Sequence, residues 1–399
     1  MKRIYLDHAA TTPIDNSVAK AMRDFELVYF GNPSSVHREG QEARARIDFA
    51  RAQVAEFIAA KPQEIIFTSG ATEANNLAIH GVVNHAIQKL KIKPHVVTTQ
   101  LEHHSVYNLV KDLEKRGVVE ATFVKPSADG MISAANVIKA IKKNTVLISI
   151  IFVSNEIGSI LPVREIGRLL KANSYPANPL FHVDAVQALK FLNCNVEKLG
   201  CDLLTLSAHK IYGPKGIGAL YIKSGLSAGG GPASGEKMQN LMFGGAQEYG
   251  RRPGTQNTAG IIGFAKAVEL LGSLEARQKN AGKIAKLRDA LVKELLKISL
   301  LELNGPLGEN RTADNVSITI YGVDQDSLMT ALDLVGVSAS TGSACVSGSS
   351  EASHVIEALG KTSIQKSATL RLTLGKDNTS AEIKRVAMLI KQIILNLSA

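Results

Sequence analysis

The sequence contains few of the residues that mark disulfide-rich and zinc-binding proteins. Only three of its 399 residues are cysteine, namely Cys194, Cys201 and Cys345. An odd number at spacings that match no zinc-binding pattern argues against a disulfide framework, and we predict no metal site. So few cysteines also fit a reducing compartment.

Long apolar runs are missing as well. Although 45% of the residues are hydrophobic, no run reaches the roughly 18–20 residues that cross a bilayer. The stretch MKRIYLDHAATTP enters a strand-like run, without the apolar core of a signal peptide or the pattern of a transit peptide. We therefore expect a cytoplasmic, enzyme-like protein with no membrane association, used without processing.

Aromatic residues make up only 5% of the chain, whereas the formal net charge is +10. The lysines are spread along helix faces, as in IQKLKIK and KAIKK, and no nucleic-acid-binding signature accompanies them. We interpret the charge as a solvated basic surface and predict no direct nucleic-acid partner. The competing hypothesis is a non-catalytic scaffold or nucleic-acid-binding protein that exploits this charge.

Short β-rich runs alternate with amphipathic helical runs between residues 64 and 222. A further helix is predicted over 36–60, before this region. Crossover connections of this kind predict a mostly parallel sheet with helices on both faces. A long helix over about 259–297 and a smaller α+β unit follow. The predicted strands of the first region are 64–68, 95–99, 119–124, 145–153, 180–184 and 202–206.

Polar groups stand at the carboxyl ends of several predicted strands, where ligands of open α/β sheets bind. In IIFTSGATEANN, the backbone N–H groups near Gly70, Ala71 and Thr72 could form a phosphate-binding cup at a helix N-terminus. A plain strand-to-helix turn with Thr72 as N-cap explains the same residues.

Two further predicted strands end at residues with ionisable side chains, Asp184 in LFHVDAVQ and Lys210 in LSAHKIYGPKGIG. Asp184 could pair with a pyridinium nitrogen or simply cap the next helix. Lys210 could form a Schiff base, or the strand could merely turn at the surface near Gly213. Asn155 follows another strand and could donate a hydrogen bond to a ring oxygen. His103 follows a further strand, and its flat imidazole could stack on a planar cofactor. A phosphate cup, an aspartate and a lysine in this order suit pyridoxal phosphate.

With these residues together, the sequence resembles the NifS-like cysteine desulfurases. These enzymes belong to the class V aminotransferase family and have fold type I. The resemblance runs nearly end to end, through IYLDHAATTP, FGNPSSVHREG, IIFTSGATEANNLAI, EHHSV, SNEIG, VDAVQ, LSAHKIYGPKGIG, RPGTQN, STGSACVSGS and LRLTLG. It implies a large pyridoxal-phosphate-binding domain over 12–257, with a mostly parallel seven-stranded sheet. Residues 1–11 and 258–399 then form a smaller α+β domain.

The resemblance also implies roles for individual residues. Lys210 carries pyridoxal phosphate and moves the α-proton, and His103 stacks on the ring and is a possible acid or base. Thr255 reaches the phosphate from the second subunit, so the active unit is expected to be a homodimer. Arg371 clamps the substrate carboxylate, aided by Asn155. The remaining cofactor-binding residues that the resemblance implies are Ala71, Thr72, Ser207 and His209 at the phosphate, Asp184 at the ring nitrogen, and Gln187 and Asn155 at the phenolic oxygen.

Cys345 decides which reaction is expected. Its neighbours are mainly serine, glycine and alanine, which are typical of a loop in which a thiol is accessible. Cys194 and Cys201 are instead interpreted as small buried hydrophobic residues. The family's cysteine in this motif is the nucleophile. The expected reaction gives L-alanine from L-cysteine and leaves a persulfide on Cys345. This sulfur would pass to a protein acceptor for iron–sulfur cluster assembly or tRNA thiolation. The alternatives within the fold are a selenocysteine lyase or another class V aminotransferase-like enzyme.

Overall fold

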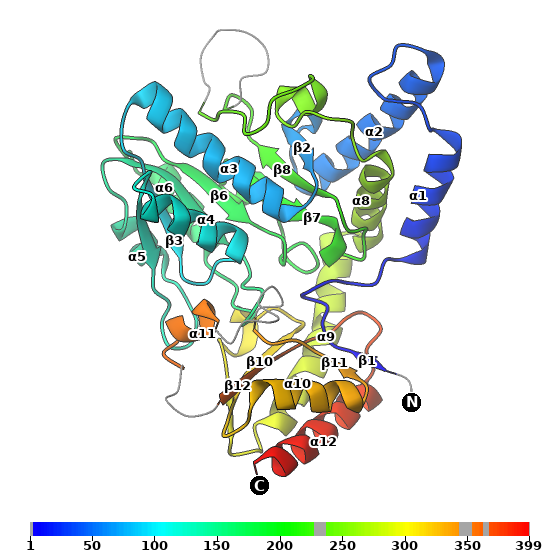
Figure 1. Ribbon diagram of the computed structural model, residues 1–399, viewed down its shortest axis with the longest axis vertical. Coiled ribbons are helices and arrows are strands. Elements are labelled where there is room, and N and C mark those ends of the chain that lie inside the picture. The colour runs from blue at the N-terminus through cyan, green and yellow to red at the C-terminus, as the bar shows by residue number, and fades with distance from the viewer. Residues whose placement is uncertain (1–2, 227–236, 343–352, 362–366, 399) are drawn as a thin grey trace.

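The computed structural model describes residues 3–226, 237–342, 353–361 and 367–398. These residues form a larger and a smaller body (Figure 1). Within them, no helix combines the length and apolar character needed to cross a bilayer.

A seven-stranded sheet forms the centre of the larger body, in the order β2-β8-β7-β6-β5-β3-β4. All neighbouring strands are parallel except at β8, which is antiparallel to both β2 and β7. The mostly parallel α/β fold predicted from the sequence is therefore confirmed, although the strand pattern did not include β8. The strands are β2 (Ile65–Thr68), β3 (His95–Thr99), β4 (Glu120–Val124), β5 (Thr145–Ile151), β6 (Leu180–Asp184), β7 (Leu203–Ser207) and β8 (Gly218–Ile222).

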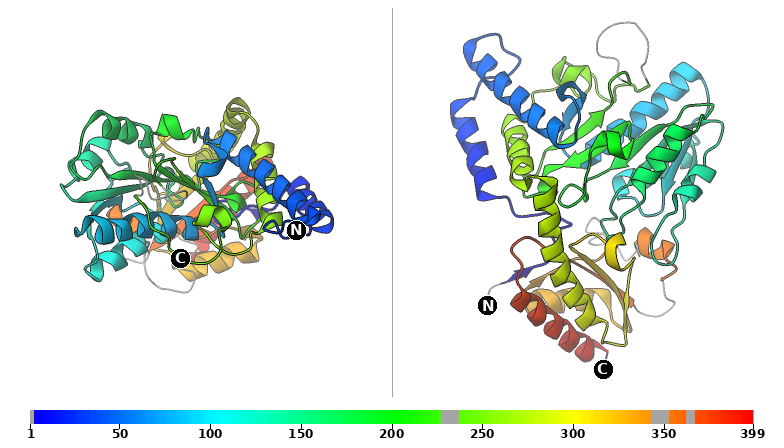
Figure 2. Two further views of the ribbon diagram at one scale, coloured as in Figure 1. Left: turned by 90° about the horizontal axis from the view of Figure 1, so that it is seen from above. Right: turned by 180° about the vertical axis from the view of Figure 1, so that it is seen from behind.

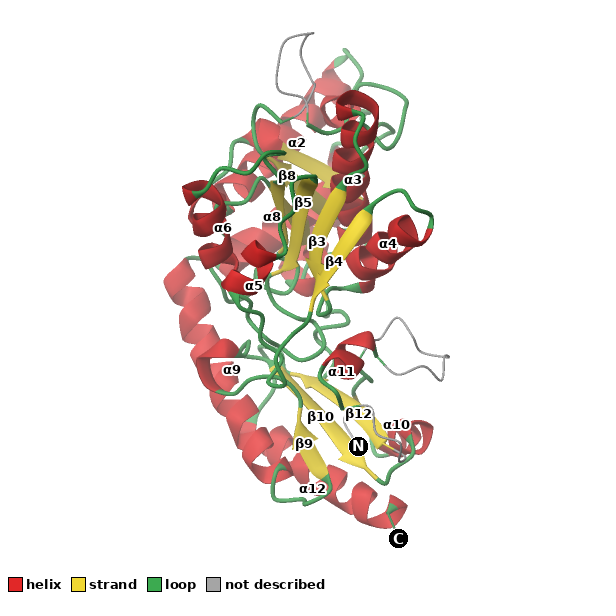
Figure 3. Cartoon of the chain, turned by 90° about the vertical axis from the view of Figure 1, so that its left-hand side faces the viewer, coloured by secondary structure: helices red, strands yellow, loops and turns green. Residues whose placement is uncertain are grey.

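Helices cover both faces of this sheet (Figure 3). One face packs on α3 and α4, and the other on α1, α2, α5, α6 and α8. Because the central strands are buried on both faces, they are mainly apolar, as in other parallel sheets, and buried polar side chains within them such as His182 are hydrogen-bonded. The helices are α1 (Asn16–Val28), α2 (Arg38–Phe57), α3 (Ala71–His85), α4 (His104–Lys115), α5 (Ala134–Lys139), α6 (Val163–Ala172), α7 (Val196–Leu199) and α8 (Thr258–Leu271).

The smaller body has its own core and a three-stranded antiparallel sheet in the order β12-β10-β9. The N-terminal strand β1 pairs with β11 in a separate two-stranded sheet. The strands are β1 (Ile4–Tyr5), β9 (Leu301–Leu303), β10 (Asn315–Tyr321), β11 (Val337–Ser338) and β12 (Ser367–Thr373). The helices of this body are α9 (Leu274–Leu295), α10 (Gln325–Leu334) and α12 (Ser380–Leu397). The short helix α11 (His354–Ala358) lies between α10 and α12 in sequence, but its Val355 and Ile356 pack in the larger core.

The single helix expected over 259–297 is two helices. Gly272 ends α8 with a φ of 69°, and Ser273 caps α9 by accepting from the N–H of Ala276. Ile261 and Phe264 of α8 pack in the larger core, while α9 runs into the smaller body (Figure 2). We therefore propose that the boundary between the two units falls near Gly272 rather than at 258.

Candidate functional site

A cavity of about 470 Å³ lies where β5, β6 and β7 end, a size typical of small-molecule sites. Most of the residues that the sequence analysis selected line it. They are Ala71, Thr72, His103, Asn155, Asp184, Gln187, Ser207, His209, Lys210 and Arg371.

The N-terminus of α3 forms one wall of this cavity. The helix begins at Ala71 with Gly70 as its N-cap and no capping side chain, so the alternative that Thr72 is the N-cap is wrong. The uncapped first turn directs backbone N–H groups and the positive end of the helix dipole toward the cavity. The buried Ser207 hydroxyl, which also lines this cavity, has no hydrogen-bond partner within the described ranges of the chain. This wall offers hydrogen-bond donors suited to a phosphate.

Lys210 stands in a single 3₁₀ turn, Ala208–Lys210, directly after β7. Its Nζ donates to the backbone oxygens of Ala9 and Ala10, at 2.7 and 2.6 Å. The neighbouring His209 lies 3.2 Å from Thr11 Oγ1 through Nδ1. Burial, together with the positive charge of Lys210, lowers the pKa of His209 to about 3, so its imidazole is neutral at pH 7.

Asp184 ends β6 and is only 3% exposed. Its two oxygens accept from the Asn75 side chain at 2.8 Å and from the Val186 N–H at 3.0 Å. Burial raises the pKa of this carboxyl, which means that a cationic partner in the cavity would stabilise its charged form. The expectation that Asp184 caps a helix is wrong, because residues 186–191 form turns, and its carboxylate caps the first of them. Asp184 also lines the cavity, and its pairing with a pyridinium nitrogen stays a prediction.

A chain of hydrogen bonds joins Asp184 to His103. The Asn75 amide donates to Asp184 and to Ser105 Oγ, and Ser105 Oγ lies 2.8 Å from His103 Nδ1. The Ser105 N–H also donates to this Nδ1 at 3.1 Å, so a neutral His103 carries its proton on Nε2. Burial, with the nearby Lys210 charge, lowers the pKa of His103 to about 4. The ring is therefore a neutral group of fixed tautomer.

Arg371 reaches the cavity from β12 of the smaller body. Its guanidinium donates to the carbonyls of Asn155 and Gly342, both at 3.0 Å, and to Ser340 Oγ at 2.7 Å. It also pairs with Asp7 at 3.1 Å. Its Nε is buried and has no partner among the described residues. A buried guanidinium held in this way is suited to bind a carboxylate.

Sequence reasoning missed several residues that shape the site: Asp7, Ala9, Ala10, Asn75 and Ser340. Gln187, which the sequence did indicate, contacts one of these residues, because its side-chain amide donates a hydrogen bond to the backbone oxygen of Ala9 at 3.0 Å. The motif IYLDHAATTP could have indicated Ala9 and Ala10, because two small residues allow the chain to approach a neighbouring side chain closely. Nothing in the sequence indicates Asn75, whose role depends on the packing of α3.

Two candidate residues lie elsewhere. Thr255 lines a second cavity, of about 310 Å³, which shares Ser69, Gly216 and Ile217 with the first. Cys345 lies outside the described residues. Cys194 and Cys201 are buried as expected, and burial raises the pKa of both thiols, to about 12 for Cys194.

The model of the aminotransferase class-V family matches residues 4–386, so the chain belongs to the class V aminotransferases. Among its relatives is "Cysteine desulfurase IscS" of Dictyoglomus turgidum, which is 42% identical over 99% of this chain and 95% of the relative. The likeness to the NifS-like cysteine desulfurases is thereby confirmed.

Solved structures give the same result. One named "NIFS-LIKE PROTEIN" superposes with a TM-score of 0.85 at 32% identity, covering 99% of both chains. Another, "SspA in complex with cysteine", superposes with a TM-score of 0.77 at 33% identity, covering 94% of this chain and 99% of that one.

Proposed function

We propose that the protein is a pyridoxal-phosphate-dependent cysteine desulfurase. The observation that carries this proposal is the meeting of three groups at one cavity: the Lys210 amine, the buried Asp184 carboxylate and the unpartnered Ser207 hydroxyl. The names of its relatives support the reaction, and the similar structure of SspA in complex with cysteine supports L-cysteine as the substrate.

The residues present fit the cofactor. The N-terminus of α3 and Ser207 would hold the phosphate, together with Ala71, Thr72 and His209. Asp184 would pair with the protonated ring nitrogen. His103 would stack on the ring and, because it is neutral, would add no positive charge beside that nitrogen. Gln187 and Asn155 would lie near the phenolic oxygen. When bound, pyridoxal phosphate supplies an electron sink for the bonds of the substrate α-carbon.

The other steps belong to the chain's own residues. Lys210 would carry the cofactor and then, as a neutral amine, take the proton from the α-carbon. Arg371 would hold the substrate carboxylate and so fix which bond of the α-carbon faces the ring. Asn155 would assist, since its backbone oxygen already orients the guanidinium.

Cys345 is the proposed nucleophile. Its thiolate would attack the substrate sulfur, forming an S–S bond while the carbon–sulfur bond breaks and its electron pair stays with carbon. Protonation of that carbon, and return of the α-proton by Lys210, yield L-alanine, and the sulfur remains on Cys345 as a persulfide. No external oxidant is needed, because the substrate carbon is reduced as its sulfur is transferred.

We further propose a cytoplasmic homodimer in which Thr255 completes the phosphate site of the partner subunit. Two observations support this arrangement. Thr255 lines the adjoining cavity, outside the wall formed by Ser207 and Lys210. Large apolar side chains are also exposed on the larger body, with Phe30 77%, Val36 88% and Phe243 89% exposed. The sulfur would pass to a protein acceptor such as an iron–sulfur scaffold.

Mass spectrometry of the protein after incubation with L-cysteine tests the proposal. One extra sulfur is expected on the peptide that contains Cys345, and none on that peptide in Cys345→Ala, which should retain its cofactor. Cys194→Ala is the matched control and should still form the persulfide. Unchanged release of alanine and sulfide by Cys345→Ala would exclude this mechanism and favour a lyase that needs no cysteine nucleophile.

A further inference from the structure

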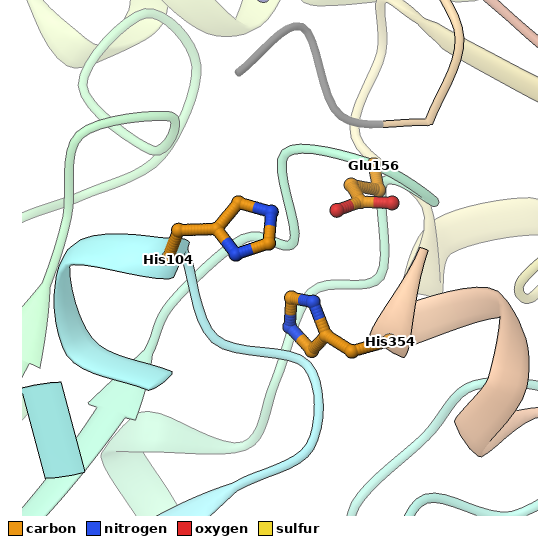
Figure 4. A group of neighbouring side chains, drawn as sticks. All are labelled: His104, Glu156 and His354. Atoms are coloured by element: carbon orange, nitrogen blue, oxygen red, sulfur yellow. The ribbon is translucent and has the colours of Figure 1, made fainter. Parts of the chain in front are cut away.

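A second group of chemically active side chains lies beside the cavity but does not line it. Among the residues that the structure describes, His104, Glu156 and His354 each offer one nitrogen or oxygen, and these atoms lie within 4.8 Å of one another. They come from the first turn of α4, the loop after β5 and the first turn of α11. The three side chains point toward one another (Figure 4).

His354 is already oriented as a ligand. Its Nε2 lies 3.0 Å from the backbone oxygen of Glu102, and because a carbonyl only accepts, Nε2 must carry the proton. The lone pair of the neutral ring is then on Nδ1, which is buried and has no hydrogen-bond partner in the part of the chain that the structure describes. The ring also stacks on Tyr107, with centroids 4.0 Å apart and planes at 21°. Metal-binding histidines are typically fixed by such a bond from the other ring nitrogen.

Glu156 supplies the negative charge. It is only 2% exposed, and its Oε2 accepts a hydrogen bond from the Ser353 hydroxyl. Burying a carboxylate costs free energy that a nearby cation offsets. The His104 ring lies against that of His354, with centroids 4.8 Å apart, on the side where the three groups meet.

Two imidazoles and one carboxylate form a ligand set typical of zinc sites with an open fourth position. Zinc–ligand bonds of about 2.0–2.2 Å place tetrahedral ligands roughly 3.4 Å apart. The ligand atoms must therefore move inward by about 1 Å, which side-chain rotation of His104 and Glu156 can supply. The three residues are far apart in sequence, which is why cysteine and histidine spacing predicted no metal.

We propose that His104, Glu156 and His354 bind a divalent first-row metal ion, with Zn²⁺ as the best match, and leave one coordination position for a water or thiolate. The bound ion ties α11 to the start of α4 and to the loop after β5. The preceding residues, His103 and Asn155, line the main cavity. The site is distinct from the proposed cofactor site and does not depend on it.

The test uses the full chain with its cofactor, freed of metal by a chelator and titrated with Zn²⁺ by calorimetry. One ion per chain is expected. Co²⁺ should give the visible absorption of a tetrahedral site. His354→Phe retains the aromatic stack on Tyr107, and Glu156→Gln can still accept from Ser353. Each should weaken Zn²⁺ binding by more than about tenfold, since loss of even an outer-shell partner costs about 10–100-fold.

His80→Phe on α3 is the matched control and should bind Zn²⁺ as the parent does. Circular dichroism checks that each variant is folded, and His104→Asn provides a further ligand variant if one of the others is not. The proposal is wrong if the parent chain binds no Zn²⁺. It is also wrong if binding survives both His354→Phe and Glu156→Gln but is lost in Cys345→Ala, because a thiol elsewhere then holds the ion.

Discussion

The two bodies contribute different kinds of group to the cavity. The larger one supplies Lys210, Asp184 and Ser207, all at the ends of neighbouring strands of one rigid sheet. The smaller one supplies Arg371, from an antiparallel strand of a separate sheet. The difference teaches that the groups proposed to hold the cofactor within one chain lie on the larger body, whereas the proposed binding of a substrate carboxylate depends on how the two bodies meet.

The contacts between the bodies support this division. Arg371 is held by Asp7 and Ser340 of its own body and by the Asn155 carbonyl of the other. A buried ion pair between Lys190 and Asp314 also joins the larger body to the smaller one. Arg371 is therefore positioned by groups on both sides, so a small change there should alter substrate binding while the strand-end residues stay in place.

The largest effect is expected from Lys210→Ala, because this residue is proposed both to carry the cofactor and to move the α-proton. Turnover of L-cysteine should fall by about 10³-fold or more. The visible absorption of the covalently bound cofactor should disappear, as measured by spectrophotometry and an alanine assay. Lys223→Ala, on the larger body but outside the cavity, should keep both the absorption and the activity. Full activity in Lys210→Ala would remove the basis of the proposed mechanism.

Most of the larger body could be predicted from sequence because its buried strands are short, mainly apolar runs and four of them, β2 to β5, alternate with helices. The strand β8 could not, since it follows a loop with Gly213 and Gly216 rather than a helix. Ser207, Asp184 and Lys210 could be selected because strand ends in such sheets meet at one edge. Asn75 and the His104 cluster depend on contacts between distant segments, for which no local pattern exists.

A smaller and more selective effect is expected from Arg371→Lys. Lysine retains the charge but lacks the planar fork that binds a carboxylate through two hydrogen bonds. Loss of one charge-assisted bond of about 1.5–3 kcal/mol corresponds to a rise in KM for L-cysteine of roughly 10–100-fold. Cofactor absorption should not change. Steady-state kinetics and the absorption spectrum of the same sample give both quantities.

Arg311→Lys is the matched control for this variant, because Arg311 is also a buried arginine of the smaller body but does not line the cavity. It should lower stability without the selective rise in KM. If Arg371→Lys instead lost its cofactor while remaining folded, the division of labour between the two bodies would be wrong.

The smallest effect concerns stability and again separates the bodies. Eight of the ten histidines lie between residues 12 and 272, and only His8 and His354 lie outside this range. His182 in β6 is fully buried between Ser149 and Thr205, and burial lowers its pKa from the usual 6.5 to about 3. The unfolded chain therefore binds a proton here below about pH 6.5 that the folded chain excludes. The folded state loses stability through this residue as the pH falls from about 6.5 to 3.

His182→Gln should isolate this contribution, because glutamine can bond to both hydroxyls but does not titrate. Near pH 7 the variant should be slightly less stable than the parent. The difference in free energy of unfolding between parent and variant should shrink, and then change sign, by up to about 1.4 kcal/mol per pH unit below about pH 6.5. Urea unfolding of both proteins at about pH 7 and about pH 5 measures it. The buried Glu102 has a raised pKa, which makes the folded state more stable as the pH falls. Both proteins contain Glu102, so its contribution cancels in the difference between them. A gap that stays constant over this range would mean that His182 binds its proton equally in the folded and unfolded chains.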